Sequence, residues 1–309
     1  MAMTLPEAAK LETGDVFKSG VIEFYAGSSG VLTALPFENI SGNAYKYNTE
    51  LTLPGVGFRG VNEGYTESVG VINPQTESLV IAGGDLDVDK FIIDTMGDGV
   101  RDKHERMKLR ALSLSWTKKF VKGDSTVDPR EMDGLQRRLG GNQLIPAGAT
   151  SGGDALSLSK LDQLIDQVID PTHLIMNKTM RRRLTAAARN SSVGGFITFG
   201  VDELGRQVAK YNDLPIILLD LDEAGSQILD FNEANPGGGG NASTSIYCVN
   251  FSENAVMGLQ NGNMDVRDLG ELESKPVFRT RVEWYSTFGI FHGRGAARLN
   301  GIKDAAVVV

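Results

Sequence analysis

The glycine-rich segment Gly55–Gly60, with the sequence GVGFRG, matches the G-x-G-x-x-G pattern of dinucleotide-binding turns. That pattern holds a pyrophosphate only when a helix begins directly after the glycines. The residues that follow are VNEGYTES, which contain another glycine and no helical stripe of apolar residues. We therefore interpret the segment as the flexible tip of a hairpin and expect no bound dinucleotide.

The segment Asp94–Glu105 has the outline of a calcium-binding loop. Acidic residues and a glycine occupy its positions 1, 5, 6, 9 and 12, as Asp94, Asp98, Gly99, Asp102 and Glu105. Position 3 is Met96, which offers no hard oxygen, and no apolar helix leads into the loop. Acidic capping of a helix N-terminus explains these residues better, and we expect no metal site.

Histidine and cysteine are too few for most catalytic or metal centres. The chain has three histidines, His104, His173 and His292, which lie far apart in the sequence, and one cysteine, Cys248. One cysteine excludes an intramolecular disulfide framework and a multi-cysteine zinc site. The sequence contains no G-x-S-x-G nucleophile elbow. We predict that the protein has no catalytic residues, no cofactor and no metal.

The charge balance is acidic, with 39 Asp and Glu against 31 Lys and Arg and a formal net charge of −8. This balance argues against a protein whose main function is to bind the phosphates of nucleic acid. The one notable basic cluster is Arg181–Arg183, on an expected helix. We interpret it as a solvated face or a subunit contact, with nucleic-acid readout as the less favoured alternative.

The composition predicts a folded protein of one or two domains. Its 309 residues are 41% hydrophobic and 23% charged, which allows a sizeable core. Glycine contributes 37 residues and proline 10, a balance that predicts many tight turns and no proline-rich linker. No apolar run reaches the length of a membrane span, and the acidic segment Met1–Tyr25 lacks the apolar core of a signal peptide. We expect a soluble protein made in a reducing compartment.

Two strand patterns flank the glycine-rich tip. Residues 43–53 alternate, with Tyr45, Tyr47, Thr49, Leu51 and Leu53 on one side. A second strand-like run, Glu77–Ala82, closes at Gly83-Gly84. The pattern predicts a long hairpin arm, and a two-stranded arm is marginal in water. Its apolar side therefore needs another surface, in this chain or in a neighbouring copy.

A long helix is predicted after the arm, because Val100–Lys122 contains neither proline nor glycine. Acidic residues from Asp85 to Asp98 precede it and basic residues gather toward its end, which suits the helix dipole. Its core-facing stripe, at spacings of three and four residues, comprises Leu109, Leu112, Trp116 and Phe120.

The rest of the chain reads as a mixture of helices and strands. Before the arm we predict a short helix at Asp15–Tyr25 and an apolar run at Val31–Phe37. After the long helix we expect helices following Ser157 and at Lys178–Arg189, and strands at His173–Asn177, Ile216–Leu219 and Ile246–Phe251. An extended strand should follow, with Phe278, Val282, Trp284, Phe288 and Ile290 on one side, ending at Arg298-Leu299.

This order of parts resembles the major capsid proteins of tailed bacteriophages that share the HK97-like fold. The resemblance is closest to the group with separately encoded scaffolding and no cleaved N-terminal delta domain. It rests on LPFENISGNAYKYN at Leu35–Asn48, GFRGVNEGYTES at Gly57–Ser68, TESLVIAGGDLDVDKFI at Thr76–Ile92, SWTKKFVKGD at Ser115–Asp124 and MDGLQRRL at Met132–Leu139. Together these segments extend the resemblance over nearly the whole chain.

The resemblance implies an α+β chain in five parts. These are an N-terminal arm at 1–42, an E-loop hairpin at 43–84, a P domain with its spine helix at 85–124, an A domain at 125–265 and a return strand to the P domain at 266–309. Some relatives cross-link an E-loop lysine to a neighbour's asparagine. The tip here, Pro54–Gln75, has no lysine, and Lys46 lies at the base, so we expect no such cross-link.

The function implied by the resemblance is structural. Copies would form the pentamers and hexamers of an icosahedral phage head around double-stranded DNA, with Arg59 and Glu63 as candidate inter-subunit contacts. The implied partners are a scaffolding protein, a portal protein at one vertex, a decoration protein and packaged DNA that is enclosed without sequence-specific binding, with no membrane. The subunit would be made in the host cytoplasm and reside in the virion. The alternatives are an encapsulin-type nanocompartment with a cargo peptide and, third, a hydrolase or nucleotide enzyme.

Overall fold

A computed structural model describes residues 2–7, 25, 27, 29–52, 54–97, 99–189, 197–201 and 207–308. Its helices are α3 (Gly30–Ala34), α4 (Lys90–Met96), α5 (Gly99–Lys122), α6 (Leu135–Arg138), the 3-10 helix η1 (Gly141–Gln143), α7 (Leu158–Asp166) and α8 (Lys178–Ala188). Its strands are β1 (Met3–Thr4), β2 (Pro36–Asn39), β3 (Ala44–Thr52), β4 (Val71–Ser78), β5 (Val80–Asp89), β6 (Leu144–Pro146), β7 (His173–Asn177), β8 (Ile197–Val201), β9 (Gln207–Tyr211), β10 (Leu214–Leu219), β11 (Glu233–Ala234), β12 (Asn241–Val249), β13 (Val256–Gln260), β14 (Asp265–Glu271), β15 (Val277–Ile290) and β16 (Ala296–Ile302). No helix among the described residues has the length and apolar character needed to span a membrane.

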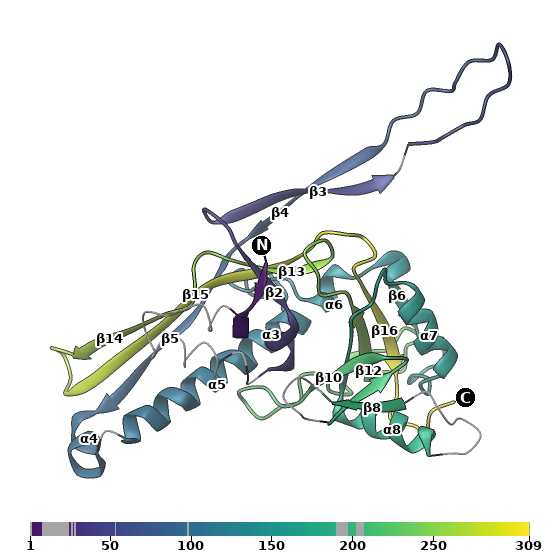
Figure 1. Ribbon diagram of the computed structural model, residues 1–309. Coiled ribbons are helices and arrows are strands. Elements are labelled where there is room, and N and C mark those ends of the chain that lie inside the picture. Colours follow the sequence, from purple (N-terminus) through teal and green to yellow (C-terminus); the bar gives the residue numbers. More distant parts are fainter. Residues whose placement is uncertain are drawn as a thin grey trace.

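The strands among the described residues form two sheets and one separate hairpin (Figure 1). The first sheet has the order β1-β2-β13-β15-β14, with β5 on the other side of β15. The second has the order β6-β16-β12-β7-β10-β9-β8, with β11 paired to β12. Strands β3 and β4 pair with each other, with no third strand beside them in the described part of the chain, and extend away from both sheets.

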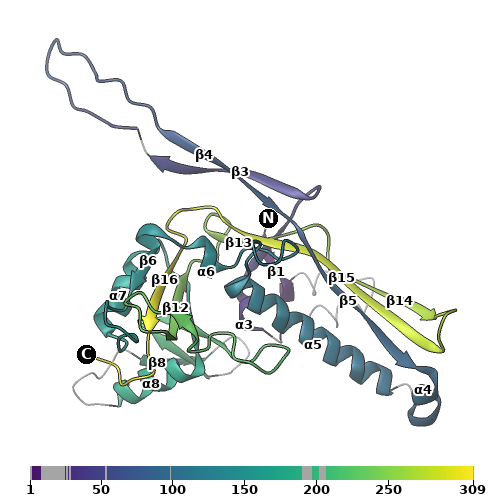
Figure 2. The ribbon, with the colours of Figure 1, turned by 180° about the vertical axis from the view of Figure 1, so that it is seen from behind.

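The long helix and its predicted stripe are confirmed. Helix α5 lies along the first sheet, as the view from behind shows (Figure 2). Leu109, Trp116 and Phe120 are buried, and Leu112 packs against the same core while partly buried. The Trp116 ring stacks on Phe120 with centroids 5.6 Å apart and lies 5.8 Å from the Trp284 ring of β15.

The one-sided pattern of β15 is also confirmed, but the strand ends earlier than expected. Val282, Trp284 and Phe288 are buried, as the alternation predicts. The strand stops at Ile290, whereas the prediction continued it to Arg298-Leu299. Those two residues belong to β16, which pairs with β12 and β6 in the second sheet. The turn between them, HGRG at 292–295, interrupts the extended run and carries the chain from one sheet to the other.

The second sheet is covered on both faces. One face holds α7 and α8 through Leu161, Leu164, Met180 and Leu184. The opposite face contributes Ile175, Tyr247 and Val249 to the core shared with α5 and β15. The predicted helices after Ser157 and at Lys178–Arg189 are present as α7 and α8, and the three predicted strands as β7, β10 and β12. The molecule is therefore layered, with the second sheet between two helical layers.

The acidic residues from Asp85 to Asp94 belong to strand β5 and the short helix α4, so their assignment to the N-terminus of one long helix was wrong. Asp85 and Asp87 lie in β5, where their carboxylates pair with Arg281 and Arg279 across the ladder. Asp89 caps α4, its side chain accepting a hydrogen bond of 2.8 Å from the Phe91 amide. A separate helix, α5, then begins at Gly99.

The glycine pair Gly83-Gly84 does not close a strand, contrary to the prediction. Strand β5 runs through both residues to Asp89. A Cβ at Gly83 would lie 2.5 Å from the Val282 carbonyl oxygen of β15. The glycine is therefore required by the close approach of two paired strands rather than by a turn.

The N-terminal predictions are resolved only in part. The helix expected at Asp15–Tyr25 lies outside the described residues except for Tyr25, which is buried against Trp284. The apolar run Val31–Phe37 is divided between α3 and β2. Val31 and Leu32 of α3 and Phe37 of β2 all enter the core around Trp284.

Substitution of the central stripe residue tests this core. Trp116→Ala should lower the free energy of unfolding by about 3–5 kcal/mol, because it leaves a cavity among packed aromatic rings. Met107→Ala on the exposed side of the same helix should change it by no more than about 0.5 kcal/mol. Urea titration followed by far-ultraviolet circular dichroism measures both. Equal stability of the two variants would show that the Trp116 face is not the buried one.

Candidate functional site: a projecting hairpin and its root

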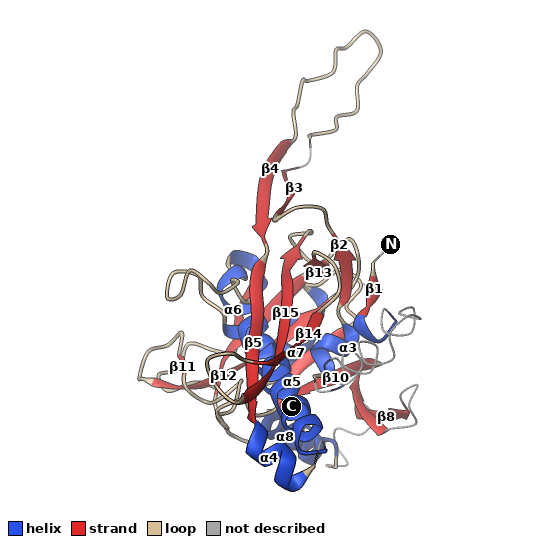
Figure 3. Cartoon of the chain, turned by 90° about the vertical axis from the view of Figure 1, so that its left-hand side faces the viewer, coloured by secondary structure: helices blue, strands red, loops and turns tan. Residues whose placement is uncertain are grey.

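The hairpin tip exposes an unusual amount of apolar surface. Strands β3 and β4 are paired along their length, from Ala44 opposite Ser78 to Thr52 opposite Val71. Residues 54–70 beyond them form a long open loop (Figure 3). Its apolar side chains keep between 72% and 105% of their full exposure: Val56, Phe58, Val61, Tyr65 and Val69. Apolar side chains exposed in this number on one short loop are typical of a segment that is covered by another protein.

Arg59 and Glu63, the predicted inter-subunit contacts, both lie in this tip. The Arg59 guanidinium donates to the Glu63 carbonyl oxygen at 3.2 Å and lies 5.2 Å from the centre of the Tyr65 ring. The Glu63 carboxylate accepts from the Gly60 amide at 2.9 Å. These contacts shape the turn of the tip. The contact of either residue with a neighbouring copy stays a prediction.

An aromatic cluster fixes the root of the hairpin. The ring of Tyr47 lies 4.5 Å from that of Phe291, just after β15, and Tyr45 meets the same ring edge-on at 5.9 Å. The Tyr47 hydroxyl lies 3.3 Å from the Ile290 carbonyl oxygen and 3.2 Å from Glu77 Oε1. Burial and the neighbouring Glu77 carboxylate raise the pKa of Tyr47 to about 12.

A half-buried ion pair holds the second strand of the root. Arg138 of α6 donates both terminal nitrogens to the Glu77 carboxylate of β4, with Nη2 2.7 Å from Oε2. The two side chains are 15% and 14% exposed. The guanidinium also lies 4.7 Å from the centre of the Phe288 ring. The alternation in the sequence predicted that Tyr45 and Tyr47 lie on the same side of their strand. No pattern in the sequence links Glu77 with Arg138.

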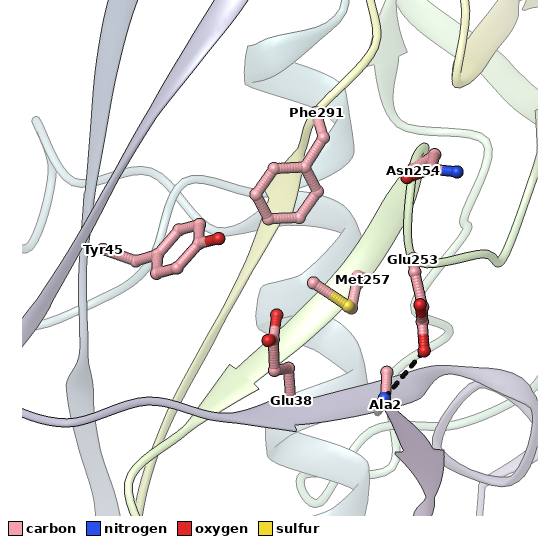
Figure 4. Close-up of a pocket in the computed structure, with 7 residues that line it drawn as sticks. All are labelled: Ala2, Glu38, Tyr45, Glu253, Asn254, Met257 and Phe291. Atoms are coloured by element: carbon pink, nitrogen blue, oxygen red, sulfur yellow. Dashed lines mark hydrogen bonds between the residues drawn. The ribbon is translucent and has the colours of Figure 1, made fainter.

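A cavity of about 390 Å³ opens beside the root (Figure 4). Its lining comprises Ala2, Glu38, Tyr45, Glu253, Asn254, Met257 and Phe291. The Glu253 carboxylate accepts a 2.8 Å hydrogen bond from the Ala2 amide. No lining residue is a histidine, serine or cysteine, and no group of three metal-ligating side chains occurs among the described residues.

A second cavity of about 470 Å³ lies at the end of α5, near Lys122, Asp124, Arg137 and Glu233. Its charged groups are paired with one another. Arg137 binds Asp124, while Lys122 Nζ lies 3.6 Å from Glu233. The other Glu233 oxygen accepts from Arg298 Nη2 at 2.8 Å and from Ser245. The arrangement ties α5 to the second sheet and is best explained as structural.

The chemistry-bearing residues singled out in the sequence lie apart. His104 is exposed on α5, and Glu105 of the calcium-like loop accepts from Arg101 and Thr280. His173 on β7 is largely buried beside Phe251, and burial lowers its pKa to about 4. His292 accepts a hydrogen bond from the Arg294 amide. Cys248 is buried in β12, where burial raises the pKa of its thiol to about 12 and keeps it unreactive.

Known proteins match this chain in structure but not in sequence. No protein-family model and no curated protein matches it. The holo-SrpI encapsulin complex of Synechococcus elongatus is similar, with a TM-score of 0.63 and 16% identity over 89% of this chain and 88% of that chain. The capsid of an empty GTA particle has a TM-score of 0.60 and 13% identity over 89% and 90%. A chain from Mycobacterium phage Adephagia has a TM-score of 0.60 and 12% identity over 90% of each chain.

These similarities extend over about nine tenths of the chain, and at such low identity they concern the fold. The chain has the HK97-like capsid fold, an α+β architecture, as the sequence resemblance predicted.

Truncation of Arg138, which removes the ion pair at the root, should lower the free energy of unfolding. Arg138→Ala should cost about 1.5–3 kcal/mol, because it removes both guanidinium donors from the half-buried Glu77 carboxylate and leaves it only the Tyr47 hydroxyl. It should also speed amide hydrogen exchange in β3 and β4. Lys90→Ala, which removes the well-exposed pair with Glu271, should cost about 0–1 kcal/mol. Unchanged exchange in β3 and β4 of Arg138→Ala would mean that the pair does not hold the hairpin.

His173 predicts a pH dependence of folding. Its pKa is about 4 in the folded state, below the ordinary value of about 6.5, so the folded protein disfavours the proton. Its stabilising contribution is complete above about pH 6.5 and is lost as the pH falls toward 4. Between pH 7 and 5 the wild type should lose about 2 kcal/mol more than His173→Phe. Parallel losses in urea titrations at the two pH values would contradict this.

Proposed function

We propose that this chain is the subunit of a self-assembling protein shell with a structural rather than a catalytic role. The observation that carries the proposal is the projecting hairpin, whose tip exposes five large apolar side chains while its root is held rigidly by the core. Such an arm gains burial only by lying on another molecule. The fold shared with an encapsulin shell and a GTA capsid supports a second copy as that molecule.

Within this role we propose the major capsid protein of a tailed bacteriophage, present as pentamers and hexamers of an icosahedral head around double-stranded DNA. The phage-like sequence segments support this choice, as does the similar fold of a chain from a mycobacterial phage. The partners would then be a scaffolding protein during assembly, a portal protein at one vertex and a decoration protein on the shell. The subunit would be made in the host cytoplasm and reside in the virion.

An encapsulin-type nanocompartment is the second candidate, favoured by the similarity to the SrpI encapsulin complex. The contents of purified particles separate the two. A phage head assembled during infection should contain DNA that resists added nuclease. A nanocompartment should instead contain one stoichiometric cargo protein. Absorbance at 260 and 280 nm, nuclease protection and mass spectrometry of the particles give the answer.

Shortening the arm tests the shell proposal itself. Thr52 and Val71 are cross-strand partners, so replacing residues 53–70 by Asn-Gly should close β3 and β4 as a two-residue hairpin. The variant should keep the circular dichroism and unfolding midpoint of the wild type but fail to form particles in sedimentation velocity. A matched variant of unchanged length, Val56→Ser with Phe58→Ser and Val61→Ser, should weaken assembly in the same direction. Normal particles from both variants would defeat the role given to the hairpin.

A further inference from the structure

Helix α8 presents an unpartnered basic face to solvent. Met180 and Leu184 are buried against the second sheet, which leaves Arg181, Arg182 and Arg189 exposed. The helix lies at the end of the molecule opposite the hairpin (Figures 1 and 3). It therefore belongs to a different surface from the proposed arm contact.

The charges of α8 are only partly compensated. The sequence KTMRRRLTAAA contains no acidic residue, and Arg189 follows directly at the C-cap. Lys178 pairs with Asp220, and Arg183 pairs with Asp304 at 2.8 Å. In the described part of the chain, Arg181, Arg182 and Arg189 have no ion-pair partner. We define these three arginines as the α8 patch.

Such a patch is unexpected in a chain with 39 acidic residues and a net charge of −8. Neighbouring cations on one helix repel, and a pair such as Lys178 and Arg182, four residues apart, costs a helix a few tenths of a kcal/mol. An external anion would remove this repulsion. Guanidinium groups match phosphate oxygens in a two-pronged geometry and are weakly hydrated, which makes arginine the favoured cation for binding phosphate.

We propose that the α8 patch contacts the phosphate backbone of the nucleic acid inside the shell, without reading its sequence. The inference rests on the proposed shell function and adds that this face of the subunit lines the interior. Three arginines supply few contacts per subunit, so each copy would bind weakly. Repetition over many copies would order the outer layer of the nucleic acid while the acidic remainder of the chain repels it.

Salt dependence tests the patch directly. Each phosphate contact on duplex DNA contributes about −0.9 to the slope of log K against log salt concentration. Removing two arginines with Arg181→Gln and Arg182→Gln should therefore make the slope shallower by about 1.8. Removal of Arg189 as well should bring the change to about 2.7. Fluorescence anisotropy of a labelled mixed-sequence DNA duplex with the dilute full-length subunit, at 50 to 200 mM salt, measures the slope.

The matched control removes two exposed cations from other surfaces, Arg130→Gln and Lys275→Gln. It loses the same net charge and should keep the wild-type slope. Glutamine is a good helix former, so unfolding midpoints should not change in the α8 variants. Equal slopes for the wild type, the α8 variants and the control would overturn the proposal. Binding of poly-L-glutamate in preference to the duplex would also overturn it, in favour of an acidic protein partner.

The assay does not depend on shell formation, so failures of the two proposals are distinguishable. Duplex binding through the α8 patch by a protein that forms no particle would reject the shell and its interior, while retaining phosphate binding. Particles whose subunits bind duplex with the same slope in all variants would retain the shell and reject the role of α8.

Discussion

The packing of Trp116 on α5 against Trp284 on β15 is the contact on which the rest of the molecule depends. Strand β15 pairs with β5 over ten positions and with β13 and β14 on its other side, so Trp284 sets the register of most of the first sheet. A shift of one residue would turn Arg279, Arg281 and Glu283 inward and expose the aromatic face. The cost of burying those charges holds the register in place.

The same strand determines where the arm points. Phe288 of β15 lies under the Arg138 guanidinium, its Ile290 carbonyl faces Tyr47, and the next residue, Phe291, contacts both root tyrosines. The root is thus part of the core, whereas the tip keeps its apolar side chains in solvent. A rigid root with an uncovered tip is the arrangement expected of a subunit whose fold is completed by its neighbours.

The spacing of apolar residues was enough to predict the helices and strands in which those residues recur at one regular interval. The α5 stripe, the alternation of β15 and the helices α7 and α8 are of this kind, because burial alone decides their faces. The errors occurred where two explanations shared one pattern. Asp85 and Asp87 suited a helix N-terminus as well as a strand ladder, and Gly83 suited a turn as well as close strand packing. The Glu77–Arg138 and Glu233–Arg298 pairs could not be predicted, since their partners are 61 and 65 residues apart and single charges have no period.

Electron microscopy of the purified wild-type protein shows whether the chain completes its fold by assembly. We expect closed shells, or pentameric and hexameric capsomers, in which the hairpin of each copy lies on an adjacent copy. A field of separate particles of the 33.3 kDa subunit, under conditions where the protein is folded and the hairpin intact, would contradict this expectation.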